Sequence, residues 1–258
     1  ANNGQNTNNE TYVAWCWKAG GGTTSSNTDG TITSTVQTNR DAGFSIIKYT
    51  GNGSGGATIG HNLGVVPNMF IVKKLSAGTT NWRVYHTHTD SSPQNYNLEL
   101  NGNGAKEDRT EWNDTMPTSS VISFNAHDSV NGSGSDYICY AFTNIAGFSK
   151  FGGYTGNGST NGPIVETGFE PAFLMVRRTD SGDGWLILDN KRNLTNPRNN
   201  SLKADESAAE EANSAVRTTD FLSNGFQLKH SHQGMNASGG NYIYMAFAAD
   251  PDTEAPTL

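Results

Sequence analysis

Cysteine is scarce in this chain, which has only two among its 258 residues, Cys16 and Cys139. Two cysteines do not make up a disulfide framework of the kind that holds small secreted domains together. Each of them lies inside an apolar, strand-like stretch. We therefore predict two buried free thiols instead of a structural disulfide.

Charged residues are also few, and basic residues are in the minority. Charged side chains make up 16% of the chain, and the formal net charge is −7. Because nucleic-acid binding requires a basic patch, we expect no nucleic-acid partner. No apolar run approaches the roughly 18 residues that a membrane-spanning helix needs, so we expect no membrane insertion. Since the chain starts without a methionine or a signal-like segment, we expect Ala1 to be a cropped, cleaved or engineered end.

Glycine and asparagine are abundant instead. The chain has 30 glycines, and Asn-Gly occurs as a dipeptide eight times. Both residue types tolerate the positive φ angles of tight hairpin turns. Aromatic residues reach 10%, which is not the composition of a disordered chain. These proportions indicate a folded protein with many short strands joined by tight turns.

A motif of six residues, Tyr-Thr-Gly-Asn-Gly-Ser, occurs at residues 49–54 and again at residues 154–159. The segments around it repeat too, and each copy closes on a strand-like hexamer, at residues 137–142 and 242–247. Matched anchors at a near-constant offset indicate tandem structural units. A third hexamer of this type, residues 12–17, stands near the N-terminus with no unit of its own before it.

This repeat predicts the domain organisation. Residues 1–19 would hold the last strand of a truncated preceding repeat, and residues 20–42 would be a Gly/Ser/Thr linker or an extended arm. The two repeats would be residues 43–147 and 148–250, followed by a C-terminal tail at residues 251–258. About seven short strands fall within each repeat of about 105 residues, which is typical of a β-sandwich or a β-barrel. We therefore predict an all-β protein of two tandem, jelly-roll-like sandwiches. Residues 201–216, rich in Ala and Glu, predict a short helix or a loop with helical tendency.

Two His-x-His pairs are the clearest metal candidates: His86 with His88, and His230 with His232. In a strand, residues i and i+2 lie on one face, so each pair could offer two imidazoles to a metal ion. No carboxylate or cysteine stands at a suitable spacing, and we favour exposed histidines at strand ends over a metal site. The metal alternative requires three copies of a pair to meet on the axis of a trimeric fibre. We expect no cofactor.

No catalytic motif is present, and we expect no enzymatic activity. A pair of carboxylates that meets only in space would support glycoside hydrolysis; the acidic residues that leave this open are Glu99, Glu107, Asp108, Glu111 and Asp114. Trp82 and Trp185 occupy matching places in the two repeats and are interpreted as core anchors. Tyr96 and Trp112 have no such counterpart. Because loops that differ between similar units can carry specificity, these two are our candidate ligand-binding residues.

At these anchors the sequence resembles the repeat-containing virion structural proteins of marine tailed bacteriophages, which are often described as tail-fibre-like. The resemblance extends to about Asp250 and is carried by residues 11–21, 29–36, 60–67, 117–121, 148–151, 154–158 and 221–226. It implies a protein at the virion surface, in contact with other virion proteins. It carries over no catalytic residue.

Together, the repeat and the resemblance predict a non-enzymatic structural protein of a fibre, tail or capsid surface. We expect it to bind a glycan or protein on the host cell surface, and to be a homo-oligomer, a trimer by analogy with phage fibres. Two alternatives remain open. The protein could be a decoration or connector that never contacts the host, or, with the least support, a glycan depolymerase.

Overall fold

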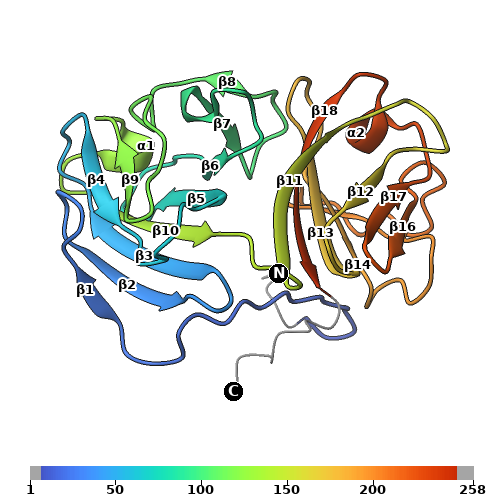
Figure 1. Cartoon of the computed structure of the whole chain (residues 1–258), viewed down its shortest axis with the longest axis horizontal. Coiled ribbons are helices and arrows are strands. Elements are labelled where there is room, and N and C mark those ends of the chain that lie inside the picture. The colour runs from blue at the N-terminus through green and yellow to red at the C-terminus, as the bar shows by residue number, and fades with distance from the viewer. Residues whose placement is uncertain (1–6, 249–258) are drawn as a thin grey trace.

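The structure is a computed structural model that describes residues 7–248 (Figure 1). Within this range the chain forms 18 strands, two one-turn α-helices and one 3-10 turn, η1, and all named strands pair antiparallel. The all-β prediction is confirmed. The elements of the first half are β1 (Ser25–Asn27), β2 (Ser34–Asn39), β3 (Phe44–Thr50), β4 (Ala57–Gly60), β5 (Met69–Lys74), β6 (Arg83–His86), η1 (Pro93–Asn95), β7 (Tyr96–Glu99), β8 (Glu107–Asp108), β9 (Val121–Phe124), α1 (Asp128–Asn131) and β10 (Asp136–Phe142). Those of the second half are β11 (Ser149–Thr155), β12 (Ile164–Glu166), β13 (Pro171–Arg178), β14 (Leu186–Asp189), β15 (Leu202–Lys203), β16 (Thr219–Leu222), β17 (Gly225–Leu228), α2 (Gln233–Asn236) and β18 (Asn241–Ala248).

Each half has one large and one small sheet. The large sheet of the first half has the order β1-β2-β3-β10-β5-β6-β7-β8, and its small sheet pairs β4 with β9. In the second half the large sheet is β11-β18-β13-β14-β15 and the small sheet is β12-β17-β16. The order β3-β10-β5-β6-β7 of the first half thus returns in the second as β11-β18-β13-β14-β15.

The sheets lie in four layers, with the small sheets outermost and the two large sheets facing each other (Figure 1). Three apolar clusters fill the spaces between the layers. The first core and the second core each lie between a large sheet and its own small sheet. The third cluster, which we call the junction core, lies between the large sheets; its members include Phe44, Met69, Ile71, Val84, Phe142, Phe151, Phe173, Met175, Trp185, Ile187, Met245 and Phe247.

Strand β18 shows why the strands of the large sheets are continuous apolar runs. Its residues alternate between two clusters: Tyr242, Tyr244 and Ala246 face the second core, while Met245 and Phe247 face the junction core. Successive side chains of a strand point to opposite faces. A strand covered on both faces therefore needs apolar residues at every position, without the alternation of a half-exposed strand.

The repeated six-residue motif forms a clasp around a buried asparagine. In the first half the side chain of Asn131, at the end of α1, accepts a hydrogen bond from the backbone N–H of Asn52 (2.9 Å). It also donates to the side chain of Asn52 (3.2 Å) and to the carbonyl of Ser54 (2.8 Å). Tyr49 donates its hydroxyl to the carbonyl of Val130 (2.6 Å). Asn131 is fully buried.

The second half repeats this clasp atom for atom. Asn236, at the end of α2, accepts from the backbone of Asn157 (2.8 Å) and donates to its side chain (3.1 Å) and to the carbonyl of Ser159 (2.8 Å). Tyr154 donates to the carbonyl of Met235 (2.7 Å). The motif recurs in the sequence because it ties the end of a long strand to a one-turn helix in each half.

Three local predictions need correction. Residues 12–17 form no strand; instead Trp15 and Trp17 pack against the junction core. Cys16 is consequently exposed, whereas Cys139 is buried as predicted. No helix forms at residues 201–216, where the chain makes β15 and turns; the two short helices lie elsewhere. For residues 20–42 the sequence leaves a linker and an extended arm open, and the pairing of β2 along β3 fits the arm.

Candidate functional site

A polar cleft lies where the two halves meet, and we call it the junction cleft. Its volume is about 360 Å³. The first half contributes the loop that follows β6, together with Lys106, and the second half contributes the end of β11 and the start of β18. The lining residues are His88, Thr89, Asp90, Ser91, Lys106, Gly153, Tyr154, Thr155, Asn241 and Tyr242.

An ion pair between Asp90 and Lys106 holds one wall of the cleft. The Asp90 carboxylate also accepts hydrogen bonds from the Ser91 hydroxyl (3.0 Å) and the Ser92 backbone N–H (3.2 Å). The hydrogen bond from Lys106 lowers the pKa of Asp90 to about 2. The Lys106 ammonium group also lies 4.9 Å from the centre of the Tyr96 ring. This wall is therefore charged at neutral pH and fixed in place by its own contacts.

His88 stands on the same wall, directly against β11. The residue opposite it is Gly153, where an added Cβ would lie 3.0 Å from the Cβ of His88. The repeat aligns Gly153 with Lys48 of the first half, so the second half has a glycine where its partner has a long side chain. The glycine makes room for the close approach of His88. The imidazole ring remains exposed to the cleft.

The opposite wall offers backbone groups as well as side chains. Strand β11 is the last strand on its side of the sheet, as far as residues 7–248 show. The backbone N–H of Phe151 points away from the sheet, to the side chain of Asn144 (2.7 Å). Every second residue of an antiparallel strand directs its backbone groups to the same edge. Gly153 and Thr155 thus present theirs on this outer edge, at the cleft.

The structure separates the two predicted ligand-binding aromatics. Tyr96 is half-buried and lies beside the cleft through its contact with Lys106. Trp112 is only 1% exposed and belongs to the first core, where its indole N–H donates to the carbonyl of Tyr96 (2.9 Å). A ligand cannot stack on a ring that the core encloses, so the interpretation of Trp112 as a binding residue is wrong. The hydrogen bond from its indole instead joins the backbone of Tyr96 to the first core.

Of the four histidines that we predicted to be exposed, only His88 is exposed. His86 is 1% exposed; its Nε2 pairs with the carbonyl of Tyr244 (3.2 Å) and its Nδ1 accepts from the backbone of His88 (3.1 Å). Burial lowers the pKa of His86 to about 3. His230 is also buried, and His232 caps α2 through its Nδ1 (3.0 Å). Within residues 7–248 no three His, Cys, Asp or Glu side chains are grouped as metal ligands.

A second cleft, of about 430 Å³, lies on the same junction. It contains His232 and two cations that are already paired within the fold. Lys203 pairs with Glu206 (2.6 Å), and Arg217 pairs with Glu211. Two polar atoms of this cleft, Asp183 Oδ2 and Arg217 Nε, are buried without a hydrogen-bond partner among residues 7–248.

Two of the scattered carboxylates do meet in space, on one guanidinium group. Arg83 pairs with Glu99 (2.5 Å) and lies 3.5 Å from Glu111. Glu111 is 1% exposed, and the cavity beside Glu99 has a volume of about 20 Å³, which is room for about one water molecule. This pair of carboxylates lacks the space that a sugar ring would need.

Sequence reasoning missed most of the junction cleft. It selected Tyr96, which lies beside the cleft, because this aromatic residue has no counterpart in the second repeat, and it named His88 only as a candidate metal ligand. Asp90, Lys106, Thr155 and Asn241 carry no local signal, since the cleft exists only where one half approaches the other. The one feature of the sequence that could have indicated the cleft was Gly153, because a glycine inside a strand often marks a close approach of another part of the protein.

The comparisons assign the chain to a family without revealing a function. The family described as "Domain of unknown function (DUF7483)" matches residues 1–251. No curated protein and no solved structure matches the chain. Within residues 7–248, no helix is long and apolar enough to span a membrane.

Proposed function

The chain belongs to the DUF7483 family, and for it we propose the role of a bacteriophage virion surface protein that binds a glycan of the host cell in the junction cleft. We further propose that its two halves are tandem β-sandwich repeats. The equal strand order of the two large sheets and the duplicated asparagine clasp support the repeat. The resemblance at residues 11–21 and 154–158 supports the assignment to a virion.

The observation that carries the glycan proposal is the composition of the cleft. The loop after β6, Lys106, the end of β11 and the start of β18 together line a cleft of about 360 Å³. This volume lies within the range of small-ligand sites. A sugar is a dense array of hydroxyl groups, each able to donate and accept, and the cleft offers both kinds of partner: imidazole, carboxylate, ammonium, amide, hydroxyl and backbone groups.

The cleft is also arranged to be rigid before a ligand arrives. Asp90 and Lys106 hold each other, and Tyr154 and Tyr242 spend their hydroxyls on the carbonyls of Met235 and Gln233. Preorganised groups lose little freedom on binding. Several copies of the protein on one particle would raise the avidity of a weak single site, which is why we include homo-oligomerisation in the proposal.

The test compares variants that leave the fold intact. In the described part of the chain, no hydrogen bond of the fold runs through the side chain of His88 or of Asn241, so H88A and N241A should fold normally. Asn224 lies in a surface turn away from the cleft, and N224A is the matched control. Each fluorescently labelled protein is incubated with a panel of marine and laboratory bacteria, with or without purified surface polysaccharide, and retention on washed cells is scored.

We expect strain-selective retention that the polysaccharide competes away and that N224A preserves. Losing one hydrogen bond to a sugar costs about 1 kcal/mol, so each cleft variant should bind about fivefold more weakly. Retention that H88A and N241A leave unchanged would place the binding site elsewhere. Retention on no strain would refute host binding and favour the decoration or connector role.

A further inference from the structure

Three hexamers in this chain share one pattern of residue types. They are residues 12–17, residues 137–142 in β10 and residues 242–247 in β18. All begin with tyrosine followed by a β-branched residue, carry alanine or cysteine at the fifth position, and end with an aromatic residue. Two of the three are central strands of a large sheet.

The central strands assign a direction to each position of the pattern. In β10, positions one, three and five (Tyr137, Cys139 and Ala141) face the first core and are 0% exposed. Positions four and six, Tyr140 and Phe142, pack against the junction core. In β18 the same positions divide in the same way between the second core and the junction core. Each central strand thus turns one face to its own sandwich and the other to the junction.

The segment at residues 12–17 shows half of this arrangement. Positions four and six, Trp15 and Trp17, pack against the junction core, as they do in the two strands. The Trp17 ring lies 5.5 Å from the rings of both Phe173 and Phe247. Positions one, three and five, namely Tyr12, Ala14 and Cys16, are exposed, and Tyr12 is 57% exposed. Ala14 and Cys16 thus lie exposed on the face that would meet a sandwich core.

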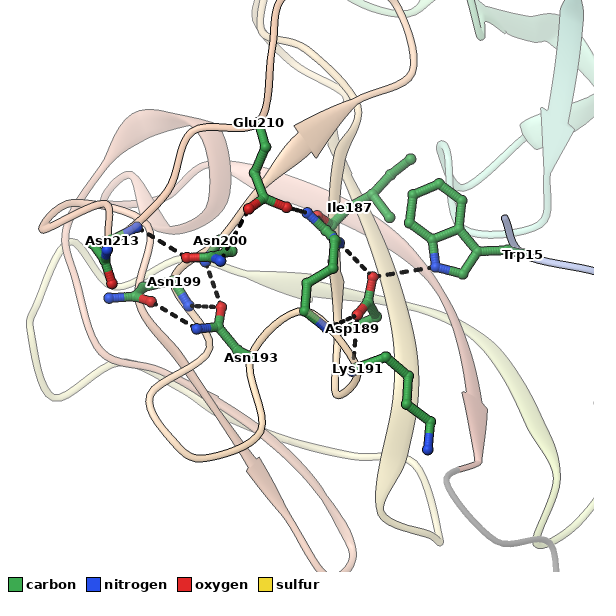
Figure 2. Close-up of polar contacts among 10 residues, drawn as sticks. Trp15, Ile187, Asp189, Lys191, Asn193, Asn199, Asn200, Glu210 and Asn213 are labelled. Carbon is green, nitrogen blue, oxygen red and sulfur yellow. Dashed lines mark hydrogen bonds and ion pairs between the residues drawn. The ribbon is translucent and has the colours of Figure 1, made fainter. Parts of the chain in front are cut away.

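Polar contacts set the orientation of this segment on the second half. The indole N–H of Trp15 donates to the carboxylate of Asp189 (3.2 Å), and Figure 2 shows the ring directed at that residue. The guanidinium group of Arg192 lies 5.6 Å from the centre of the same ring and donates to Asp189 (2.7 Å) and to Glu210 (2.6 Å). This network holds the tryptophan face inward and therefore holds the other face outward.

An apolar groove of about 280 Å³ runs beside the segment. Ala14, Trp15, Cys16 and Trp17 line it together with Phe148, Phe173 and Phe247. The groove is continuous with the junction core, to which Phe173 and Phe247 belong. Residues 13–17 belong to none of the sheets described for residues 7–248.

We propose that residues 12–17 are the docking site of an incomplete sandwich unit of this same fold, one that lacks its last strand. In both halves the last strand lies between two antiparallel neighbours, β3 and β5 around β10, and β11 and β13 around β18. A partner with two such strands pairs with both edges of residues 13–17, fills the groove, and covers Ala14 and Cys16 with its own core. Addition of a strand through main-chain hydrogen bonds is an established mode of recognition. The proposal rests on the fold and is independent of glycan binding.

Cys16 reports on this docking, because the matching residues Ala141 and Ala246 are both 0% exposed. The experiment compares two fusion proteins. In each, a copy of part of the first half is joined to the N-terminal side of the chain that starts at Thr11. The incomplete copy, residues 43–135, ends before β10. The complete copy, residues 43–142, retains its own last strand and serves as the matched control. The rate at which Cys16 reacts with a thiol reagent is measured for both, in a C139A background.

We expect Cys16 in the incomplete fusion to react at least tenfold more slowly than in the complete fusion, and hydrogen exchange at residues 12–17 to slow with it. Introducing Ala14→Asp into the incomplete fusion should restore the fast reaction, since it places a charge in the proposed core. Equal reaction rates in the two fusions would overturn the proposal, as would aggregation of the incomplete fusion alone. Protection of Cys16 in the unfused chain that grows with concentration would identify a second copy as the occupant, which also contradicts it.

Discussion

The duplicated asparagine clasp gives the sharpest prediction about stability. We consider the substitutions N131A and N236A, each of which removes the buried amide that ties a one-turn helix to the end of a long strand. Asn131 makes three hydrogen bonds within its clasp, at 2.9, 3.2 and 2.8 Å. Asn236 makes the three equivalent bonds, and its Nδ2 also lies 2.7 Å from the carbonyl of His230. Because an amide nitrogen has only two hydrogens, this last contact shares a hydrogen with the other two donated bonds and is not counted separately.

The magnitude follows from the number of bonds. A hydrogen bond within a protein contributes about 1 kcal/mol net. We therefore expect N131A and N236A each to lower the free energy of unfolding by about 3 kcal/mol. In a chain of this size each kcal/mol shifts the melting temperature by about 3 °C, so each variant should melt about 9 °C lower. The two clasps share no residue, and the effects should add in the double variant.

The assay is denaturant unfolding followed by tryptophan fluorescence, with the melting temperature from calorimetry as a second measure. The control is N224A, in which an exposed asparagine of a surface turn is replaced. Its free energy of unfolding should change by less than about 0.5 kcal/mol. If the clasp variants lose no more stability than this control, the clasp does not hold the strand to the helix, and our explanation of the repeated motif is wrong.

Three further predictions concern the pKa of His86, the reactivity of the two cysteines, and the ion pair between Arg192 and Asp189. Burial lowers the pKa of His86 from 6.5 to about 3. As the pH falls, His86 therefore takes up a proton in the unfolded chain before it does so in the folded chain. The stability conferred by neutral His86 is complete above about pH 6.5 and declines toward pH 3. Between pH 7 and pH 4 the wild type should lose about 3 kcal/mol more than H86Q, measured by denaturant unfolding at both pH values, and equal losses would contradict the cause. A thiol reagent should modify one cysteine per native chain, Cys16, and two per unfolded chain, because burial raises the pKa of Cys139; two fast thiols in the native chain would disagree with the structure. R192Q should lower the free energy of unfolding by about 3 kcal/mol, because Asp189 is 3% exposed and would lose its cationic partner. A loss below 1 kcal/mol would show that the backbone hydrogen bonds from residues 191 and 192 are enough to stabilise the Asp189 carboxylate.

The local sequence pattern was enough to predict the strands of the large sheets and the turns. Continuous apolar runs such as the one in β5 could be predicted as strands because both of their faces are covered. The same pattern misled at residues 12–17, where residue types typical of a central strand occur without neighbouring strands to pair with. A strand is stable only when its edges are paired, and that is a property of the rest of the chain.

At the candidate site, too, some features could be predicted from the local sequence and others depend on the rest of the chain. Trp112 and Tyr96 look alike in the sequence as unpaired aromatics, yet one is enclosed in the first core and the other lies at the junction cleft. Composition and spacing by themselves determined an all-β chain whose motifs occur twice. Only the tertiary structure decided that the two large sheets pack face to face, because the junction core joins residues far apart in sequence, such as Met69 and Met245. No periodicity within either repeat encodes which surface of one meets the other, so the cleft between them could not be predicted.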